Sequence, residues 1–420
     1  MTAQLTLFNK STSPSDIAAV NDELRAFRDY GKTTEVRRTE AAGYRVPVYI
    51  NEFWTAKQRA AHSLHEISYR ACFKPQLPRF FIERFTAEGD RVYDPFLGRG
   101  TTALEAALLD RRIAGCDVNP LSKILLQPRL NPPSLHEIED HLRAMDLSDV
   151  EEYPTELETF YHPETLREIC SLKTYLLRRQ IENQLDAVDH WIRMVAVNRL
   201  TGHSPGFFSV YTLPPNQAVS IKSQQRINLK RNQTPQRRNV PQLIVKKSRE
   251  LLSDCESSTV KQLRRLASDA WLLTTSAANT PQIPPNSISL IVTSPPFLDV
   301  VDYASDNWLR CWFCGIDIKN TQITVTRSLD EWQLAMLSIF RELFRVVKPG
   351  GHVAFEVGEV RGGRVRLEDH VIPAGANAGF LPELVVINDQ QFTKTANCWG
   401  ITNEQKGTNT NRIVVFRKSE

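Results

Sequence analysis

The sequence predicts an α/β fold in which helices cover a doubly wound parallel sheet. The first observation is a strand–turn–helix–strand unit, with strands at 91–93 and 113–117 on either side of a helix at 102–111. The second is a short apolar strand at 289–292, which ends at a Ser-Pro-Pro segment. With 420 residues, the chain can bury the core of one large domain that carries an insertion.

Before the first strand, the pattern predicts helix. A helical patch near 16–29 lies in a mixed polar segment, and residues 1–60 are assigned to an N-terminal extension. From Trp54 to Phe85 the apolar spacing is again helical, with interruptions at two prolines. We expect this segment to lead directly into the strand at 91–93.

Residues 134–258 interrupt the alternation of strands and helices and are predicted to be an insertion. Its first part is acidic and helical, with one long helix expected from Pro163 to about Leu200. Its second part is polar and basic and is expected to be loop-like. No Asp or Glu occurs between His190 and Arg249, while Lys and Arg are frequent in the second half of that stretch.

After the insertion and the strand that follows it, an amphipathic helix is predicted at 334–347. Lys348-Pro349-Gly350-Gly351 ends this helix before a strand at 352–357. Two late apolar segments, 383–387 and 412–416, are expected to pair as a terminal hairpin.

Charge and hydropathy indicate a cytoplasmic protein. The first 16 residues lack a basic-then-apolar leader, and no apolar run approaches the roughly 18 residues needed to cross a bilayer. The net charge of +4 is modest for a protein that binds nucleic acid, so the basic block of the insertion is unusual within a nearly balanced chain. We expect no membrane partner.

The seven cysteines lack the spacing of a disulfide framework. Cys311 and Cys314 form a single CxxC pair without a second pair of ligands nearby. Reduced thiols packed in a core are therefore favoured over a structural zinc site, and no metal is predicted.

The turn after the first strand has the features of a loop that binds a nucleotide-type cofactor. Gly98 and Gly100 let the backbone approach a ligand at the N-terminus of a helix. Thr101 or Thr102 is expected to cap that helix. The alternative interpretation is a tight surface turn without a ligand.

Two carboxylates indicate the kind of cofactor. Asp94 ends the first strand, where an acid would repel a pyrophosphate but suits a cationic sulfonium, and the third glycine of the dinucleotide fingerprint is missing. Asp117 ends the next strand, where a carboxylate can bind both hydroxyls of a ribose, although Asp-x-Asn-Pro is also ordinary turn chemistry. This combination favours S-adenosyl-L-methionine over NAD.

Thr293-Ser294-Pro295-Pro296-Phe297 has the features of a clamp for a planar amino group. An exocyclic nitrogen accepts a methyl group when its two hydrogens are held and its lone pair is drawn out of conjugation. Ser294 Oγ and the Pro295 carbonyl can accept those hydrogens. Pro295 and Pro296 hold the backbone rigid, and Phe297 can stack on a base. A motif of this kind by itself more often only ends a strand, but beside the glycine-rich loop it indicates methyl transfer to a nucleobase.

The two motifs resemble those of the amino-group DNA methyltransferases, the adenine-N6 and cytosine-N4 enzymes of restriction–modification and related systems. Asp94–Thr102 resembles the DPF-x-G-x-GTT motif of that family. Thr293–Phe297 resembles its TSPPY motif, with Phe in place of the usual Tyr. Weaker matches are the strand at 286–291 and the helix end at 345–351. The resemblance covers residues 62–122 and 266–417 but not the insertion.

The resemblance implies a seven-strand, Rossmann-like sheet with a reversed last strand, with S-adenosyl-L-methionine as cofactor. It divides the chain into a cofactor-binding part at 61–133, the insertion at 134–258 as target-recognition region, and a catalytic part at 259–420. The order of motifs resembles the permutation called alpha, except that the insertion precedes the segment at Asp269 instead of following it.

The resemblance also implies roles for residues. Phe73 belongs to a segment similar to one that closes over the methionine moiety, and Asp269 to one that contacts the adenine region. The expected catalytic residues are Ser294, Pro295, Pro296 and Phe297. The residues expected to bind the cofactor are Phe73, Asp94, Pro95, Phe96, Gly98, Gly100, Thr101, Thr102, Asp117 and Asp269.

The target base follows from the first catalytic position, because Ser-Pro-Pro favours cytosine N4 whereas Asn or Asp there favours adenine N6. Some adenine enzymes also carry Ser, so an adenine or an RNA target remains an alternative. No Pro-Cys pair offers the nucleophile that carbon-5 cytosine methylation requires. From a different class, a catalytically silent DNA-binding protein would keep the fold for recognition only.

Double-stranded DNA is the expected partner, and a cognate restriction endonuclease is a candidate partner. Lys and Arg contact phosphates, while Arg, Asn and Gln read base edges, and the tract 222–239 is rich in all of them. A solvated flexible loop is the alternative interpretation. The residues expected to bind DNA are Lys222, Arg226, Lys230, Arg231, Arg237 and Arg238.

Overall fold

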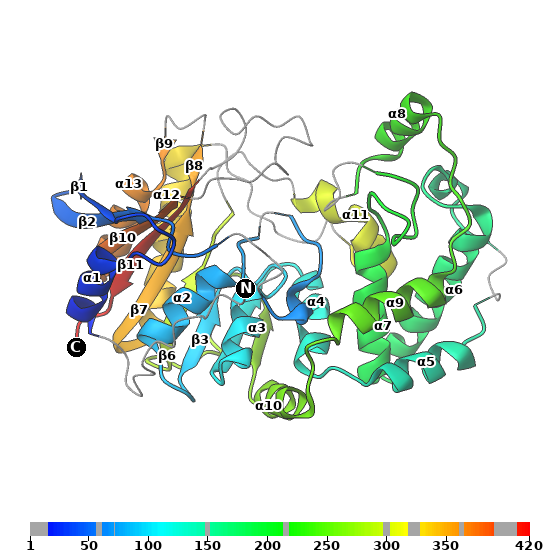
Figure 1. The fold of residues 1–420 in the computed structure, drawn as a ribbon, viewed down its shortest axis with the longest axis horizontal. Helices are drawn as coiled ribbons and strands as arrows, with labels where there is room; N and C mark the ends of the chain where they lie inside the picture. Colours follow the sequence, from blue (N-terminus) through cyan, green and yellow to red (C-terminus); the bar gives the residue numbers. More distant parts are fainter. Residues whose placement is uncertain are drawn as a thin grey trace.

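The computed structural model describes residues 16–55, 61–70, 72–147, 152–212, 218–296, 303–317, 328–360, 365–389 and 410–420. Its centre is a nine-stranded sheet with the strand order β1-β2-β10-β11-β7-β6-β3-β4-β5 (Figure 1). The strands of this sheet are β1 (Glu35–Ala41), β2 (Tyr44–Asn51), β3 (Arg91–Asp94), β4 (Arg112–Asp117), β5 (Trp271–Thr274), β6 (Ile288–Thr293), β7 (Val347–Val357), β10 (Leu381–Asp389) and β11 (Thr410–Arg417). A separate two-stranded ribbon pairs β8 (Glu359–Val360) with β9 (Val365–Arg366).

The strand directions confirm the predicted Rossmann-like sheet with a reversed last strand. Neighbours from β5 to β7 all pair in parallel. In contrast, β11 runs antiparallel to both β7 and β10. The predicted terminal hairpin is confirmed by the same pairing. Parallel strands place their carboxyl ends at one edge of a sheet, which is where ligands bind in open α/β folds.

Helices cover both faces of the sheet (Figure 1). Apolar side chains of α12 and α13 pack on one face, and those of α1, α2 and α3 pack on the other. The helices are α1 (Ile17–Ala26), α2 (Gln76–Phe85), α3 (Thr101–Leu108), α4 (Leu121–Leu130), α5 (Leu135–Ala144), α6 (Pro163–Ile181), α7 (Ala187–Arg199), α8 (Ile221–Arg231), α9 (Val240–Leu251), α10 (Ser257–Ala267), α11 (Tyr303–Cys314), α12 (Leu329–Val346) and α13 (Glu368–Asn377).

In the N-terminal region one element was not predicted and one expectation was wrong. The β1–β2 hairpin, which extends the sheet beside β10, was not predicted. All of β1 except its end is exposed or half-exposed, so the strand lacks the apolar alternation by which strands are recognised. The helix expected from Trp54 begins only at Gln76, and before it the described backbone at 66–70 and 72–74 is irregular. This segment makes long-range polar contacts that a sequence pattern does not show.

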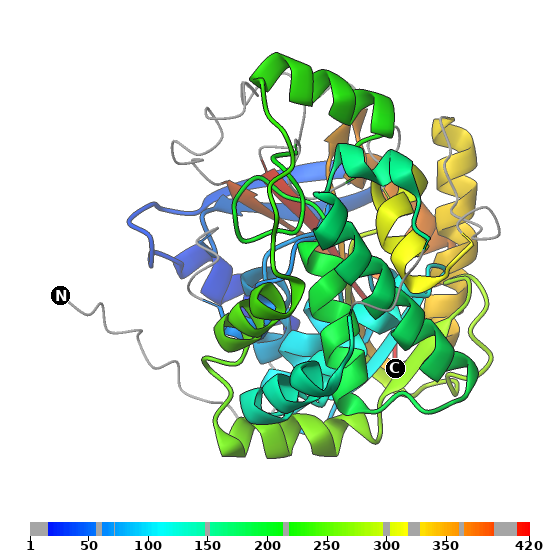
Figure 2. The ribbon, with the colours of Figure 1, turned by 90° about the vertical axis from the view of Figure 1, so that its right-hand side faces the viewer.

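The insertion forms a helical lobe beside the sheet (Figures 1 and 2). The single helix expected from Pro163 to Leu200 is two helices, because Asn183 adopts a left-handed φ of 54° and Asp186 caps α7 in a capping box with Asp189. The basic tract expected as a loop contains helix α8. Trp191 of the lobe lies in one continuous apolar cluster with α3 and α4 of the sheet domain. The lobe and the sheet domain therefore share a core.

Among the residues that the structure describes, no helix combines the length and the apolar character that crossing a membrane requires.

Candidate active site

The two sequence motifs meet at the carboxyl edge of the parallel strands. Asp94 ends β3 and Thr293 ends β6, and these two strands are neighbours in the sheet. The Thr293 hydroxyl donates a hydrogen bond to Asp94 Oδ1 at 2.6 Å. The Thr102 hydroxyl, at the start of α3, donates to the carbonyl of Val292 at 3.0 Å. Segments almost 200 residues apart in the sequence are thus joined by direct hydrogen bonds.

The glycine-rich loop between β3 and α3 is held by backbone donors. Phe96 N–H donates to Asp94 Oδ1 at 3.1 Å, and Gly98 N–H donates to Asp117 Oδ2 at 2.8 Å. Gly100 has a φ of 77°, and a Cβ there would lie 2.8 Å from Leu126 Cδ1. Only glycine meets both conditions without strain. The loop is therefore ordered by its own sequence and by the acid that ends β4.

The two threonines of the loop do not cap α3, contrary to the expectation from sequence. Gly100 occupies the N-cap position, and no side chain caps the helix there. The Thr101 hydroxyl accepts a hydrogen bond from Arg99 Nε at 3.0 Å, while that of Thr102 is bonded to β6. The N-cap residue thus offers no side-chain acceptor to the first N–H groups of α3, and helix N-termini of this kind can bind polar or anionic groups.

The electrostatics of this edge favour a cation. Burial raises the pKa of the Asp94 carboxyl to about 7, against the hydrogen bonds from Thr293 and Phe96 that lower it. Burial also raises the pKa of Asp117. Two buried carboxyls that are costly to ionise would both be stabilised as carboxylates by a positive group placed next to them. A sulfonium or an ammonium group fits that requirement.

The Ser-Pro-Pro segment after β6 is held by two described side chains. The Ser294 hydroxyl is hydrogen-bonded to the buried carboxyl of Glu356, whose pKa is raised by burial. Asn411 Nδ2 donates to Glu356 Oε1 at 2.6 Å and so fixes that carboxyl. The indole N–H of Trp332 donates to the Pro296 carbonyl at 3.0 Å. The fourth expected catalytic residue, Phe297, lies outside the described residues.

Glu356 is the residue that sequence reasoning missed at this site. It lies in the strand segment His352–Val357, one position after Phe355, which pairs with Thr293. The only signal in the sequence is an acid inside an otherwise apolar strand, which is unusual because buried carboxyls are costly. Which motif it would join depends on the register between β6 and β7, and a sequence pattern does not give that register.

One expected cofactor residue lies elsewhere, and the prediction for Asp269 is corrected. Asp269 precedes β5 and therefore lies at the amino edge of the sheet, opposite to Asp94 and Asp117. Its carboxylate binds the guanidinium of Arg91 at 2.7 Å and lies 3.6 Å from that of Arg112. Asp269 therefore neutralises two arginines at that edge, whereas Thr274, at the carboxyl end of β5, pairs with Asp117 at the opposite edge.

The other expected cofactor residues lie around the loop. Pro95 is buried and Phe96 half-buried. The carbonyl of Phe73 accepts a hydrogen bond from Arg99 Nη2 at 3.3 Å, which brings the segment of Phe73 to the loop. A cavity of about 680 Å³ opens next to Asp117, between β5 and the helical lobe. It is lined on the sheet side by Val118, Pro120 and Thr274, and on the helical side by residues that include Lys123, His190 and Arg193.

The six residues expected to bind DNA are not equivalent. Arg237 pairs with Glu164 and, at 2.8 Å, with Glu168. The guanidinium of Arg231 lies 3.7 Å from the centre of the Tyr211 ring. Arg238 is half-buried, and its backbone N–H donates to Thr165 Oγ1 at 2.7 Å. The exposed basic side chains of α8 are Lys222, Arg226, Lys230 and Arg231.

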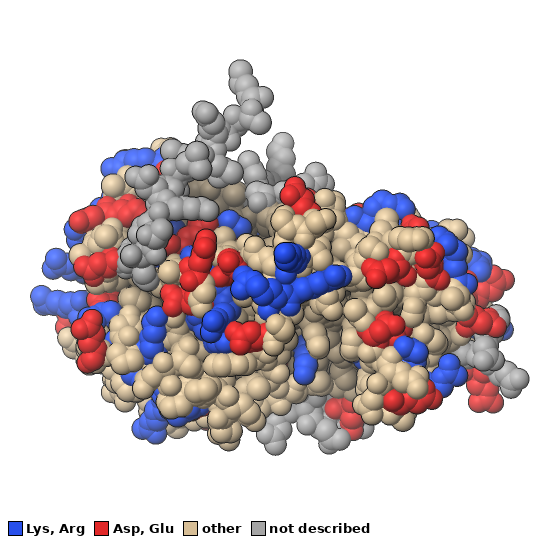
Figure 3. Space-filling view, turned by 90° about the horizontal axis from the view of Figure 1, so that it is seen from below, with Lys and Arg blue, Asp and Glu red and all other residues tan. Residues whose placement is uncertain are grey.

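Helix α8 lies on the side of the molecule toward which the strands point. In Figure 1 it is at the top, as are β8 and β9, which follow the carboxyl end of β7. The opposite face carries interspersed acidic and basic side chains among its described residues (Figure 3). The amides that were expected to read bases instead hold the helix: Gln224 and Gln233 each donate to the Tyr211 carbonyl at 3.0 Å, and Asn228 donates to the Thr159 carbonyl at 2.8 Å.

Two groups of side chains bear on metal binding. Cys311 and Cys314 are buried in α11, where burial raises the pKa of their thiols to about 11 and about 12. Within the described ranges, His141, Asp186 and Asp189 are close enough to share an ion. However, the Asp189 oxygens already bind His141 Nε2 at 2.8 Å and Arg179 Nε at 2.7 Å. The arrangement is an ion-pair network that joins α5, α6 and α7.

Parts of the chain are similar to known DNA methyltransferases. Residues 6–123 match a family whose model is described as DNA methylase, of the N6 and N4 type. The Type II methyltransferase M.BsoBI of Geobacillus stearothermophilus is 27% identical over 292 residues, which cover 61% of this chain and 54% of that protein. The Type II methyltransferase M.MvaI of Kocuria varians is 31% identical over 117 residues, which cover 27% of this chain and 24% of that protein.

The chain thus spans about half, or less, of the length of these two curated relatives. Among solved structures, a TehB-like SAM-dependent methyltransferase from Corynebacterium glutamicum aligns with a TM-score of 0.30 and 8% identity, over 81% of this chain and 87% of that one.

Proposed function

We propose that this chain, which belongs to the amino-group DNA methyltransferase family, transfers a methyl group from S-adenosyl-L-methionine to the exocyclic amino nitrogen of a flipped base in duplex DNA. Cytosine N4 is the proposed target. The observation that supports the proposal is the hydrogen bond from Thr293 to Asp94, because it joins the start of the Ser-Pro-Pro segment to the start of the glycine-rich loop. A methyl donor and a methyl acceptor must meet at such a junction.

The residues present fit the cofactor. Asp94 suits a cationic methionine moiety, because ionisation of its buried carboxyl is favoured by a neighbouring positive charge. The Asp117 oxygens accept N–H groups of Gly98 and Asn119, which hold this carboxyl at the strand end where a carboxylate can bind the hydroxyls of a ribose. The cavity next to Asp117 offers Val118 and Thr274 to a planar base. When bound, S-adenosyl-L-methionine supplies an electrophilic methyl group.

The residues of the clamp are proposed to hold and activate the amino nitrogen. Because the Ser294 hydroxyl donates its proton to Glu356, its lone pairs are available to accept one amino hydrogen of the base. The Pro295 carbonyl accepts the other. With its two hydrogens held in this way, the nitrogen lone pair would be directed at the methyl group that the cofactor supplies, and the nitrogen would have to give up one proton on transfer.

A proton acceptor is needed at that step, and Glu356 is proposed to fill this role through Ser294. The amino proton passes to Ser294 Oγ while the hydroxyl proton of Ser294 passes to the Glu356 carboxylate. Burial raises the pKa of Glu356, which makes its carboxylate a stronger base than an exposed one. Asn411 and Trp332 keep the carboxyl and the Pro296 carbonyl in place during transfer.

The target base, the nucleic acid and the functional partner are also part of the proposal. Ser294 at the first clamp position favours cytosine N4 over adenine N6, and an RNA target would use the same motifs. Duplex DNA is the proposed partner. Its proposed phosphate contacts are Lys222, Arg226 and Lys230, since they are exposed and belong to α8, a helix on the side of the strand ends. A cognate restriction endonuclease is the proposed functional partner in the cell.

Mass spectrometry of nucleosides tests the proposal. DNA of varied sequence is incubated with the purified protein and S-adenosyl-L-methionine, with the Ser294→Ala variant as control. N4-methylcytosine from the wild type and a sharp reduction from the variant are expected. Detection of N6-methyladenine would mean that the target base is adenine, with the proposed mechanism unchanged. Absence of both products, together with absence of cofactor binding in calorimetry, would favour the silent DNA-binding protein.

A further inference from the structure

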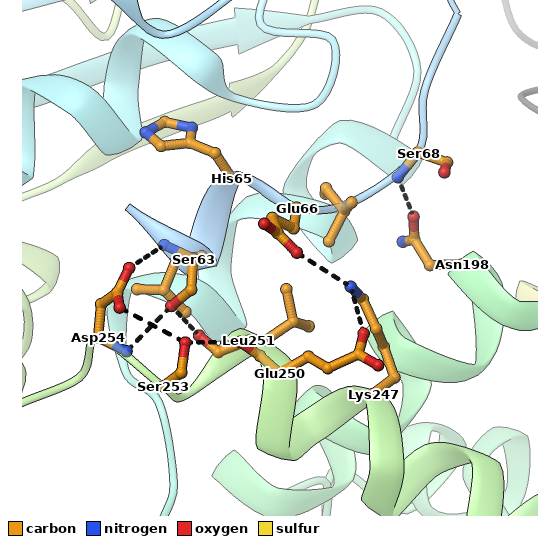
Figure 4. Close-up of polar contacts among 12 residues, drawn as sticks. Ser63, His65, Glu66, Ser68, Asn198, Lys247, Glu250, Leu251, Ser253 and Asp254 are labelled. Carbon is orange, nitrogen blue, oxygen red and sulfur yellow. Dashed lines mark hydrogen bonds and ion pairs between the residues drawn. The ribbon is translucent and has the colours of Figure 1, made fainter. Parts of the chain in front are cut away.

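Residues 62–70 and 72–73, here called the N-terminal strap, run between the cofactor loop and the helical lobe. The strap is mostly irregular backbone, with one 3₁₀ turn at Ser63–His65. On the side of the helical lobe, polar groups of the strap form hydrogen bonds and ion pairs with residues of helices and of the segments that connect them (Figure 4). Ser63 N–H donates to Asp254 Oδ2 at 2.8 Å, and Ser68 N–H donates to Asn198 Oδ1 at 2.8 Å.

On the cofactor side the strap is held by one side chain of the loop, Arg99. Its guanidinium donates to the carbonyl of Ile67 at 2.8 Å, to that of Phe73 at 3.3 Å and to that of His65 at 3.4 Å. Its Nε donates to Thr101 within the loop. The side chain is 5% exposed. One buried fork thus joins three strap carbonyls to the residue between the two glycines.

The strap lies directly over the loop. A Cβ built on Gly98 would lie 3.8 Å from Tyr69 Cε1 and 4.0 Å from Cys72 Sγ, so these two strap side chains face that glycine. A second buried arginine, Arg129, donates to the strap carbonyl of Leu64 at 3.2 Å and to the carbonyl of Arg99 itself. Burial and the charge of Arg99 lower the pKa of Arg129 to about 9.

Burying two neighbouring cations is costly unless their donors are satisfied. Here the N–H groups of both guanidinium groups donate to backbone carbonyls of the strap. Because a carbonyl is a rigid part of the backbone, these hydrogen bonds orient the strap backbone itself. A packed apolar contact at the same place would stabilise the fold without fixing the strap at that height above the loop. The position of Arg99 within the loop indicates that what is oriented is the wall of the cofactor site.

We infer that Arg99 is a positioning residue of the cofactor site, which fixes the N-terminal strap over the glycine-rich loop so that Tyr69, Cys72 and Phe73 form one wall of the site. The inference rests on the proposed function, because it assumes that a cofactor binds at this loop. Arg99 itself need not touch the cofactor. A lysine at the same position carries the charge but lacks the planar fork that reaches three carbonyls.

Calorimetric titration of the full chain with S-adenosylhomocysteine tests the inference without requiring DNA. The Arg99→Lys variant is expected to raise the Kd at least about tenfold, since several charge-assisted hydrogen bonds are lost. Ser63→Ala is the matched control: it removes a buried strap hydrogen bond to the Leu251 carbonyl, 2.8 Å long, on the lobe side. Its Kd is expected to stay within about twofold of the wild type.

The pattern of kinetic effects separates positioning from catalysis. With DNA as methyl acceptor, Arg99→Lys is expected to raise KM for the cofactor and to leave kcat nearly unchanged. An unchanged Kd in this variant, or an equal loss in Ser63→Ala, would overturn the inference. If the wild type itself does not bind S-adenosylhomocysteine, the proposed function fails instead, so the two failures are distinguishable.

Hydrogen exchange is measured on the wild type, so this test does not depend on whether the Arg99→Lys variant folds. Amides of residues 62–70 are expected to exchange more slowly after S-adenosylhomocysteine binds, because the strap closes one side of the site. Exchange that slows in the loop at 96–101 but not in the strap would show that the strap is no part of the site and would also overturn the inference.

Discussion

The Asp94→Asn variant is predicted to be more stable than the wild type above neutral pH while losing affinity for the cofactor. In the folded protein, burial raises the pKa of this carboxyl from its ordinary value of 3.8 to about 7. The folded state therefore binds the proton more tightly than the unfolded state. Between about pH 4 and pH 7 the wild type loses stability as pH rises, because the buried carboxyl must ionise.

The size of this loss follows from the two pKa values. The difference between 3.8 and about 7 corresponds to roughly 4 kcal/mol in the free energy of unfolding, of which roughly 3 kcal/mol is lost between pH 5 and pH 8. Asparagine cannot ionise, yet its Oδ1 can still accept from Phe96 N–H and the Thr293 hydroxyl, as Asp94 Oδ1 does. The variant therefore avoids the loss without losing these two bonds.

Urea unfolding of both proteins at pH 5, 6, 7 and 8 measures this effect. The advantage of Asp94→Asn over the wild type should grow by roughly 3 kcal/mol across the series. An advantage that is the same at pH 5 and pH 8 would refute the reasoning, since other titrating groups cancel in the difference. In parallel, the wild type should bind S-adenosyl-L-methionine more tightly as pH rises to about 7, whereas the variant should bind weakly at every pH.

Three further predictions concern the clamp, the loop and the DNA surface. Glu356→Gln should slow methyl transfer about 100-fold in single-turnover assays with little change in cofactor Kd, because a proton acceptor is removed; an equal loss of cofactor affinity would contradict this role. Gly100→Ala should destabilise the fold by about 2 kcal/mol in urea unfolding, because the new Cβ meets Leu126 at a positive φ. Changing exposed basic residues of α8 to Gln should lower the slope of log K for DNA binding against log salt concentration by up to about 0.9 per phosphate contact. Arg237→Gln should leave this slope unchanged, because Arg237 is already paired with Glu164 and Glu168. The residues to change are Lys222, Arg226 and Lys230.

The central sheet could be predicted from sequence because its signals are local. The turn from β3 to α3 requires glycine at positions of positive φ, and the apolar runs of β6 and β11 identify strands by their length and composition. The family resemblance depends on the same short motifs. In contrast, β1 is an exposed edge strand, and the break between α6 and α7 depends on a left-handed residue at Asn183, so neither was predicted.

The sequence by itself determined the Rossmann-like sheet, its reversed last strand, and the two motifs at Asp94 and Ser294. Only the tertiary structure decided which side chains join them. Glu356 reaches Ser294 through the pairing of β7 with β6, Asp269 is turned to the far edge by the direction of β5, and Arg99 meets the strap through three carbonyls distant in sequence. The physical reason is that motif spacing constrains backbone conformation locally, whereas contacts between a side chain and a distant backbone depend on strand register and helix packing, which no local pattern encodes.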